Sequence, residues 1–194
     1  MSARLGRVGV GVAAAACAAM LASLVLPAPR PWIVWNASAS APLGAYRILG
    51  RAPIAVGDLV AIAPPPALAE LMARRHYLPL GVPMIKRVAA LGGARVCRRG
   101  HTVLIDGKVI AHAAARDRLG RKLPVWAGCR RLRADEVFVV NAPLASFDSR
   151  YFGPLGQSDV LGRAVPLLTR DAPSAALRWH RAGADRPASH QTKG

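Results

Sequence analysis

The sequence predicts a mostly β domain with short helices, preceded by one N-terminal transmembrane helix. The β domain is indicated by apolar, β-branched runs of about four to eight residues that recur between turn residues. The clearest of them is the stretch 103–110, in which two such runs are joined by Asp106-Gly107. The membrane helix is indicated by residues 8–26, which contain no charged side chain and reach the length of about twenty residues that spans a bilayer.

The N-terminal segment is interpreted as an uncleaved transmembrane anchor at residues 8–27, with residues 1–7 in the cytoplasm. Arg4 and Arg7 precede the apolar run, and positive residues favour the cytoplasmic side. A cleaved signal peptide is the alternative, because residues 37–39 (Ala-Ser-Ala) resemble a small-x-small cleavage site. The anchor is preferred because the apolar run is longer than the hydrophobic region of a typical signal peptide.

Segment 28–170 contains the predicted β domain. Its last part is followed by residues 171–194, which are polar, lack β-periodicity and are expected to form a flexible tail. Within the domain, a short helix is expected at residues 67–75, because prolines precede it and proline is favoured at a helix start. Strands are expected at 44–49, 84–91, 135–140 and 162–168, at the end of 56–62, and in the two halves of the hairpin 103–110.

The composition limits the classes of partner. The net charge is +17, and such a basic balance suggests nucleic acid or an anionic membrane surface. Only 5% of the residues are aromatic and the arginines are scattered, so surfaces on which bases could stack are scarce. The sequence therefore predicts a lipid bilayer as a partner and no nucleic acid. It also predicts no metal and no cofactor, because its five histidines do not cluster and the CxxC and HExxH motifs are absent.

Two of the three cysteines are candidates for a disulfide. Cys17 lies in the predicted anchor, whereas Cys97 and Cys129 would both lie outside the cytoplasm, where disulfides persist. Two separate buried thiols are the alternative at this point.

A serine and a lysine carry the candidate chemistry. Lys86 lies in an apolar run that reads as a buried strand, and burial lowers the pKa of a lysine amine so that it can act as a base. Ser40 lies on a loop next to Pro42, and a serine hydroxyl needs such a base to become a nucleophile. The ordinary alternatives are a lysine that points outward from an edge strand and a serine in a turn.

A polar segment after residue 145 is the third candidate. Ser146, Asp148, Ser149 and Arg150 fall within five residues. Alone they would read as a polar turn with a local Asp–Arg pair. Near a catalytic base they would instead hold that base in place, which a base requires.

Taken in order, these segments resemble the membrane-bound signal peptidases of the type I superfamily, and most of all the conjugative-transfer, TraF-like branch. The resemblance implies a signal-peptidase-like β domain and covers roughly residues 36–168. The matching segments are 38–42 as the nucleophile box, 57–60 as the strand beside the substrate groove, 86–91 as the general-base box, and 146–153 with 162–164 as the closing box.

The resemblance implies a role for each polar residue. Ser40 would attack the scissile carbonyl, and Lys86 would take its proton and return it to the leaving amine. The backbone N–H of Ser40 and the hydroxyl of Ser38 would form the oxyanion hole. The expected support consists of Ser146, which would orient Lys86, and of Asp148, Arg150 and Arg87, which would brace it.

The resemblance also implies a function and a location. We expect a single-pass protein of the bacterial inner membrane, whose periplasmic domain cleaves exported precursors after small residues. By its branch, the substrate would be a pilin precursor for a conjugative secretion apparatus, and either hydrolysis or cyclisation would follow acylation. Ala41 stands where general signal peptidases usually carry methionine, which favours a specialised branch.

Two other functions stay open. One is a general type I signal peptidase, or a relative that cuts itself. The other is a non-catalytic, anchored scaffold of a secretion apparatus. An inert scaffold would be expected to have lost Ser40 or Lys86, and both are present.

Overall fold

The computed structural model describes residues 32–50 and 52–180. The predicted cytoplasmic segment 1–7 and the predicted anchor 8–27 lie outside the described residues, as does the last part of the predicted tail. In the part that is described, no helix has both the length and the apolar character needed to cross a membrane. The prediction of a mostly β domain with short helices is confirmed.

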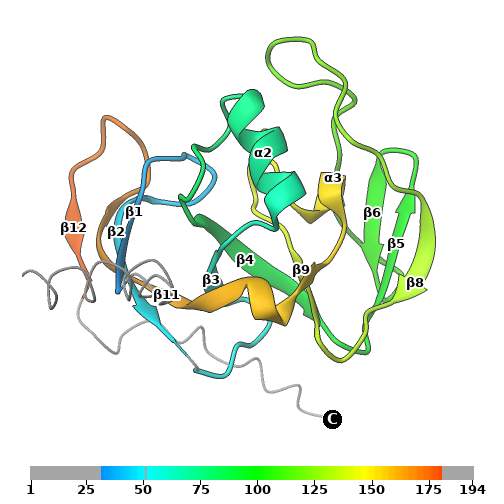
Figure 1. The fold of residues 1–194 in the computed structure, drawn as a ribbon, viewed down its shortest axis with the longest axis horizontal. Helices are drawn as coiled ribbons and strands as arrows, with labels where there is room; N and C mark the ends of the chain where they lie inside the picture. Colours follow the sequence, from blue (N-terminus) through cyan, green and yellow to red (C-terminus); the bar gives the residue numbers. More distant parts are fainter. Residues whose placement is uncertain (1–31, 51, 181–194) are drawn as a thin grey trace, which may run out of the picture. The chain divides into compact units, whose positions relative to one another are not determined.

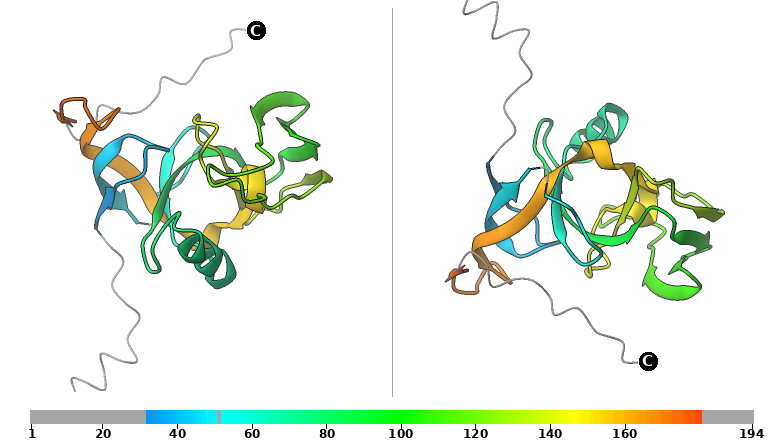
Figure 2. Two further views of the ribbon diagram at one scale, coloured as in Figure 1. Left: turned by 90° about the horizontal axis from the view of Figure 1, so that it is seen from above. Right: turned by 90° about the horizontal axis from the view of Figure 1, so that it is seen from below.

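The larger of two sheets carries the candidate site. Its strands follow the order β1-β2-β11-β3-β4-β9-β10, with β12 paired to β11, and the pairs are antiparallel. Strand β11 runs across the domain from the end beside β10 to the end beside β12 (Figure 2). The bounds are Ile33–Asn36 for β1, Leu43–Leu49 for β2, Leu59–Ile62 for β3, Met84–Leu91 for β4, Glu136–Val139 for β9, Leu155–Gly156 for β10, Val160–Arg170 for β11 and Arg178–Trp179 for β12.

The smaller sheet lies on the opposite side of the domain from β1, β2 and β12 (Figure 1). It has the order β7-β6-β5-β8, with bounds Arg95–Arg99 for β5, Thr102–Ile105 for β6, Lys108–His112 for β7 and Gly128–Arg131 for β8. The predicted hairpin is confirmed. Asp106 and Gly107 both have positive φ, of 47° and 81°, as the two-residue turns that match strand twist require.

Three short helical segments complete the fold of the described residues. Helix α2, Pro66–Arg74, begins with a proline, because the missing N–H of proline costs nothing in the first turn of a helix. It lies over β3 and β4 (Figure 1), and its Met72 is buried in the main core. Helix α3, Ser149–Phe152, and the 3-10 turn η1, Gln157–Asp159, connect β9 to β11.

Residues 171–180 differ from the expected tail. After a turn, β12 pairs with β11 through Leu168 and Trp179, so the folded domain extends about ten residues beyond the predicted boundary. No alternation of apolar and polar residues marks this strand, because two residues are too few to show one. Residues 181–194 lie outside the part that the structure describes.

Steric crowding explains why a glycine is needed at one position of the predicted closing box. Gly162 has a φ of 156°, and a Cβ at this position would lie 2.4 Å from the carbonyl oxygen of Leu49. Strand β11 therefore approaches β2 more closely than a residue with a side chain would permit. Strand β11 pairs with β2 on one side and with β3 on the other, and β3 in turn pairs with β4, the strand that carries the candidate base.

Candidate active site

The amine of Lys86 is buried and held by one hydroxyl. Lys86 lies in the middle of β4, opposite Val60 of β3, and only 5% of its surface is exposed. Its Nζ donates a hydrogen bond to Ser146 Oγ at 3.0 Å. Burial lowers the pKa of the amine to about 8, and Asp148 opposes this effect only in part. The neutral amine is therefore accessible near physiological pH, as a general base requires.

The serine loop, residues 37–42 between β1 and β2, is organised by a residue that the sequence analysis missed. Asn36, at the end of β1, is buried. Its Nδ2 donates to the carbonyl oxygens of Ser38, Ala41 and Pro42 at 2.9, 3.1 and 3.0 Å. Its Oδ1 accepts a hydrogen bond from the Ser38 N–H. One amide thus fixes both ends of the loop.

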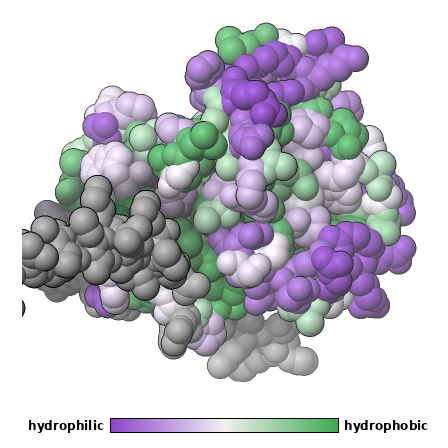
Figure 3. All heavy atoms as spheres, viewed as in Figure 1, coloured by the Kyte–Doolittle hydropathy of each residue, from purple (hydrophilic) through white to green (hydrophobic). Residues whose placement is uncertain are grey.

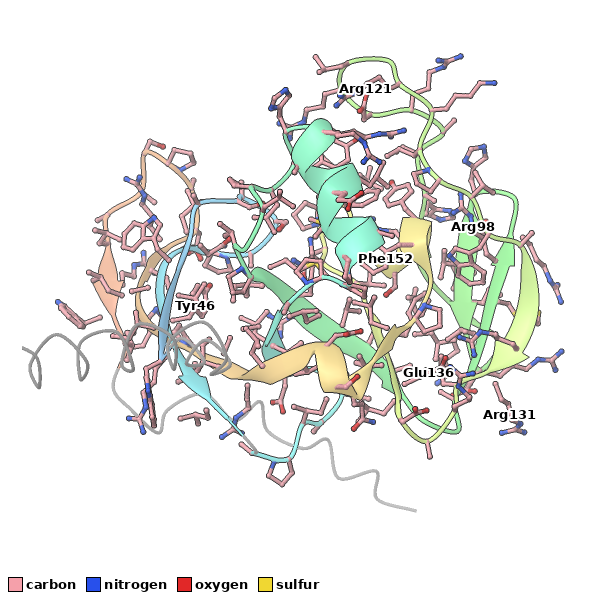
Figure 4. The ribbon with its side chains drawn as sticks, in the orientation of Figure 1. Tyr46, Arg98, Arg121, Arg131, Glu136 and Phe152 are labelled. Atoms are coloured by element: carbon pink, nitrogen blue, oxygen red, sulfur yellow. A yellow bond between two sulfur atoms is a disulfide. The ribbon has the colours of Figure 1, made fainter. Side chains whose placement is uncertain are left out.

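A second contact fixes the loop from β2. The hydroxyl of Tyr46 donates to the carbonyl oxygen of Pro42 at 2.8 Å, and the Tyr46 side chain is fully buried. Figure 4 shows Tyr46 among the strands at the β1–β2 side of the domain. The backbone on both sides of Ser40 is therefore set by buried side chains.

The two serines of the loop lie together. Ser38 Oγ and Ser40 Oγ are 3.1 Å apart, and the Ser40 N–H donates to Ser38 Oγ at 3.4 Å. The structure thus brings together the two groups expected to form the oxyanion hole. Between Ser40 and Lys86, both of which the structure describes, there is no hydrogen bond, since Lys86 donates to Ser146 and Ser40 contacts Ser38.

Asp148 and Arg150 form a buried ion pair. Arg150 Nη2 lies 2.7 Å from Asp148 Oδ2, with side chains exposed by 1% and 0%, and Arg150 Nε donates to Asp148 Oδ1 at 2.8 Å. Burial alone would lower the pKa of Arg150, but the hydrogen bonds and charge of Asp148 outweigh it and raise that pKa. Two well-aligned hydrogen bonds of this kind offset the cost of burying both charges.

The ion pair shapes the loop that carries Ser146. Arg150 Nη2 also donates to the carbonyl oxygens of Pro143 and Ser146, at 2.8 and 3.3 Å. Asp148 caps α3 by accepting from the Arg150 N–H at 3.1 Å. The pair therefore holds the backbone from which the Ser146 hydroxyl reaches Lys86.

Arg87 does not take part in this bracing. The resemblance suggested that it supports Asp148 and Arg150, but its guanidinium donates to the carbonyl oxygen of Gly57 and is exposed. This expectation is wrong, because Arg87 follows Lys86 on β4 and alternate side chains of a strand point to opposite faces.

Helix α3 is supported in turn by the smaller sheet. The guanidinium of Arg98, on β5, donates to the carbonyl oxygen of Arg150, and Figure 4 shows Arg98 between that sheet and α3. Trp126 Nε1 donates to the carbonyl oxygen of Ser149 at 3.0 Å. A disulfide joins Cys97 and Cys129, which face each other on β5 and β8. These contacts connect the disulfide region to the segment that holds Lys86.

No metal site accompanies these groups. Within residues 32–50 and 52–180, no three His, Cys, Asp or Glu side chains are grouped so as to hold a metal ion.

The chain is similar to proteins of known family. The family model for signal peptidase, peptidase S26, matches residues 5–168. A probable conjugal transfer protein TraF of Sinorhizobium fredii is 40% identical over 144 residues, which cover 69% of this chain and 76% of the relative. The conjugal transfer protein TraF of Agrobacterium fabrum is 37% identical over 146 residues, with coverages of 70% and 82%.

Among solved structures, a signal peptidase I of Enterococcus faecalis matches with a TM-score of 0.33 and 20% identity, over 59% of this chain and 98% of that one. The family match spans the serine loop, β4 and the closing segment that contains α3. The chain belongs to the signal peptidase family, peptidase S26, as a TraF-like member of the type I superfamily.

Proposed function

We propose that the protein is a membrane-anchored serine endopeptidase in which Ser40 and Lys86 form the catalytic dyad. The observation that carries the proposal is the state of the Lys86 amine. It is buried, it is held by Ser146 at 3.0 Å, and its pKa is lowered to about 8. A structural lysine would instead keep its charged end in water, whereas a general base needs a pKa near the working pH.

The proposed reaction begins with the neutral amine. Lys86 Nζ takes the proton of Ser40 Oγ as that oxygen attacks the scissile carbonyl carbon. The C–N bond then breaks, and Lys86 returns the proton to the leaving amine, which leaves an acyl-enzyme on Ser40. Water attacks the ester in the second half, with Lys86 again taking and returning the proton. Ser40 Oγ must turn from Ser38 toward the amine for the first step.

The oxyanion would be bound by the loop itself. The Ser40 N–H and the Ser38 hydroxyl now contact each other, at 3.4 Å from N to Oγ. This hydrogen bond is long and weak, so an oxyanion can replace it at little cost. Because Asn36 holds the Ser38 backbone, the two donors are positioned before the substrate arrives, which is the source of this kind of stabilisation.

The substrate proposed here is an exported precursor, cleaved after small residues, and specifically a pilin precursor for conjugative transfer. The relatives named as conjugal transfer proteins support this choice. The conjugative secretion apparatus is the corresponding partner. Whether the acyl group passes to water or to an amine of the same precursor decides between a linear and a cyclic product, and the same acyl-enzyme serves both.

The exposed aromatic residues support a location at a membrane surface, with the domain in the periplasm. On β1, Val34 and Asn36 are buried whereas Ile33 and Trp35 are 61% and 57% exposed; Trp32 before the strand is 79% exposed. Indole rings favour the interface of a bilayer. In the view of Figure 3, hydrophilic residues gather over the β7–β8 loop and the smaller sheet.

The decisive experiment compares wild type, Ser40→Ala and Lys86→Ala with a candidate pilin precursor in membranes. We expect both variants to remain folded and membrane-bound while cleavage stops. Normal processing by Lys86→Ala would exclude the dyad. If the wild-type protein cleaves no precursor and a transfer apparatus still assembles, the protein is a scaffold. Cleavage of many unrelated preproteins would identify a general signal peptidase.

A further inference from the structure

We propose that Asn141 is a positioning residue that clamps the β4 backbone on both sides of Lys86 and thereby sets where the Lys86 amine is presented. The proposal rests on the proposed function, in which this amine is the general base. No role for residue 141 follows from the sequence motifs, and the role emerges only from the contacts of its side chain.

The clamp consists of two hydrogen bonds that straddle the lysine. Asn141 Oδ1 accepts from the Arg87 N–H at 2.8 Å. Asn141 Nδ2 donates to the carbonyl oxygen of Ile85 at 3.2 Å. The residues before and after Lys86 are thus held by one amide, and the Lys86 backbone between them cannot shift without breaking a buried hydrogen bond.

The side chain replaces a strand that ends too early. Strand β9 pairs with β4 and ends at Val139, and the last backbone contact is the Val140 N–H to the carbonyl oxygen of Arg87 at 2.9 Å. Beyond this point β4 would present an unpaired N–H and an unpaired carbonyl in the interior, which is costly. The primary amide of Asn141 supplies one acceptor and one donor, and so continues the ladder.

Asn141 is itself fixed from the opposite side. Its N–H donates to Asp148 Oδ2 at 3.1 Å, and its carbonyl oxygen accepts from Arg150 Nη2 at 3.1 Å. Only 3% of its surface is exposed. The buried ion pair therefore reaches Lys86 by two routes: through Asn141 to its backbone and through Ser146 to its amine.

The chemistry of the amide explains why asparagine is needed. An aspartate could still accept from the Arg87 N–H, but its second oxygen would face the Ile85 carbonyl oxygen without a proton between them. It would also place a negative charge beside Lys86. An alanine would leave both backbone groups of β4 unpaired without adding a charge. Both substitutions therefore disturb the geometry of β4, but only Asn141→Asp changes the charge near the Lys86 amine.

The charged groups that act on the amine are few. Asp148 and Arg150, from the segment at the start of α3, act on the Lys86 amine with opposite sign. Strand β3 places Val60 opposite Lys86, β9 contributes apolar residues at its near end, and Arg87 of β4 turns to Gly57. A carboxylate at position 141 would thus be the second anion near this amine, and would raise its pKa by about one unit or more.

The test compares Asn141→Asp, Asn141→Ala and the control Val103→Ala in full-length protein. Val103 is fully buried in the core beside the smaller sheet, apart from the proposed machinery, so its truncation lowers stability without touching the clamp. We expect Asn141→Asp to move the acid limb of the pH profile of kcat/KM upward by about one pH unit. We expect Asn141→Ala to lower kcat by about 10- to 100-fold with little change in KM.

The control and a direct titration decide the outcome. An unmoved acid limb in Asn141→Asp, or a kcat for Asn141→Ala equal to that of Val103→Ala, would overturn the proposal. The pKa of the Lys86 amine is also measured by NMR of labelled lysine, with Lys86→Arg used for assignment. If no cleavage depends on Ser40, the proposed function is wrong, and this titration alone decides on Asn141: a raised pKa in Asn141→Asp supports the clamp, and an unchanged pKa refutes it.

Discussion

Lys86 Nζ lies 3.0 Å from Ser146 Oγ, and both side chains are buried although they are 60 residues apart in the chain. The amine is the only polar group of the Lys86 side chain, and the Ser146 hydroxyl supplies it with an acceptor that carries no charge. A carboxylate in the place of Ser146 would stabilise the ammonium and so remove the neutral amine that the proposed mechanism needs. The contact therefore holds the amine in position while leaving its pKa low.

Replacing Ser146 by alanine is expected to reduce catalysis far more than stability. Among the described residues, Ser146 is the only side chain that accepts a hydrogen bond from the amine, so without it the amine would no longer be held in the orientation that the proposed reaction requires. We expect kcat to fall by about 10²- to 10³-fold, within the range for a general base, with KM nearly unchanged. Single-turnover cleavage assays measure the effect, and Ser174→Ala in the exposed turn before β12 is the control. Equal rates for both variants would contradict the assigned role.

Elements of this site that depend on neighbouring residues could be predicted from the sequence, whereas elements that depend on distant partners could not. Strand β4 occupies residues 84–91 as predicted, because an apolar run followed by Gly92-Gly93 is a local signal. The hairpin at Asp106-Gly107 is equally local. Strands β5 and β8 escaped prediction because their arginine-rich sequences lack an apolar alternation, and their pairing is set by partners far along the chain.

The two asparagines show the limit of sequence reasoning most clearly. Asn36 binds three carbonyl groups of the serine loop, and Asn141 binds β4 across more than fifty positions. Neither belongs to a motif whose spacing predicts these contacts, since each replaces a backbone partner that the strand geometry leaves out. A polar residue directly after a predicted strand, at its buried end, is the one signal that was available.

Removing the charge of Lys86 is expected to stabilise the fold at neutral pH. The folded-state pKa of about 8 lies below the usual value of 10.5, so the unfolded chain binds more protons between these pH values. Burial of the charged amine therefore lowers the free energy of unfolding by about 3 kcal/mol below pH 8. This loss decreases as the pH rises toward 10.5.

Lys86→Met should accordingly raise the free energy of unfolding by about 1–3 kcal/mol at pH 7, since Ser146 loses a partner and offsets part of the gain. The gain should shrink between pH 8 and 10.5. Urea denaturation at several pH values measures both effects. A variant that is less stable than wild type at pH 7 would show that the amine is not buried at a cost, and a pH-independent gain would contradict the assigned pKa.

The ion pair of Asp148 and Arg150 is expected to contribute far more to folding stability than an ion pair on the surface. Asp148→Ala leaves a guanidinium that is 1% exposed without its counter-charge, which costs about 3–5 kcal/mol. Glu70→Ala is the matched control, because its partner Arg74 and Glu70 itself are 67% and 62% exposed and such pairs contribute at most about 1 kcal/mol. Thermal unfolding of both variants gives the comparison. Similar Tm values would mean that water reaches Arg150.

The disulfide between Cys97 and Cys129 is expected to stabilise the smaller sheet and, through it, the site. The bond closes a loop with a sequence separation of 32, and the reduced entropy of the unfolded chain corresponds to about 3–4 kcal/mol. The double variant Cys97→Ala/Cys129→Ala should therefore unfold at a lower urea concentration than oxidised wild type. Reductant should shift the wild type toward the variant and leave the variant itself unchanged, which separates loss of the bond from general effects of the reagent.

Loss of the disulfide is also expected to affect the candidate site, because residues next to the two cysteines contact α3. Arg98 comes directly after Cys97 and holds the Arg150 carbonyl, and Trp126, close to Cys129 in sequence, holds the Ser149 carbonyl. Loosening β5 from β8 should thus speed amide hydrogen exchange in α3 as well as in the smaller sheet. Exchange that increases only in β5 and β8 would show that α3 is held by its own ion pair alone, and that the two sheets are mechanically independent.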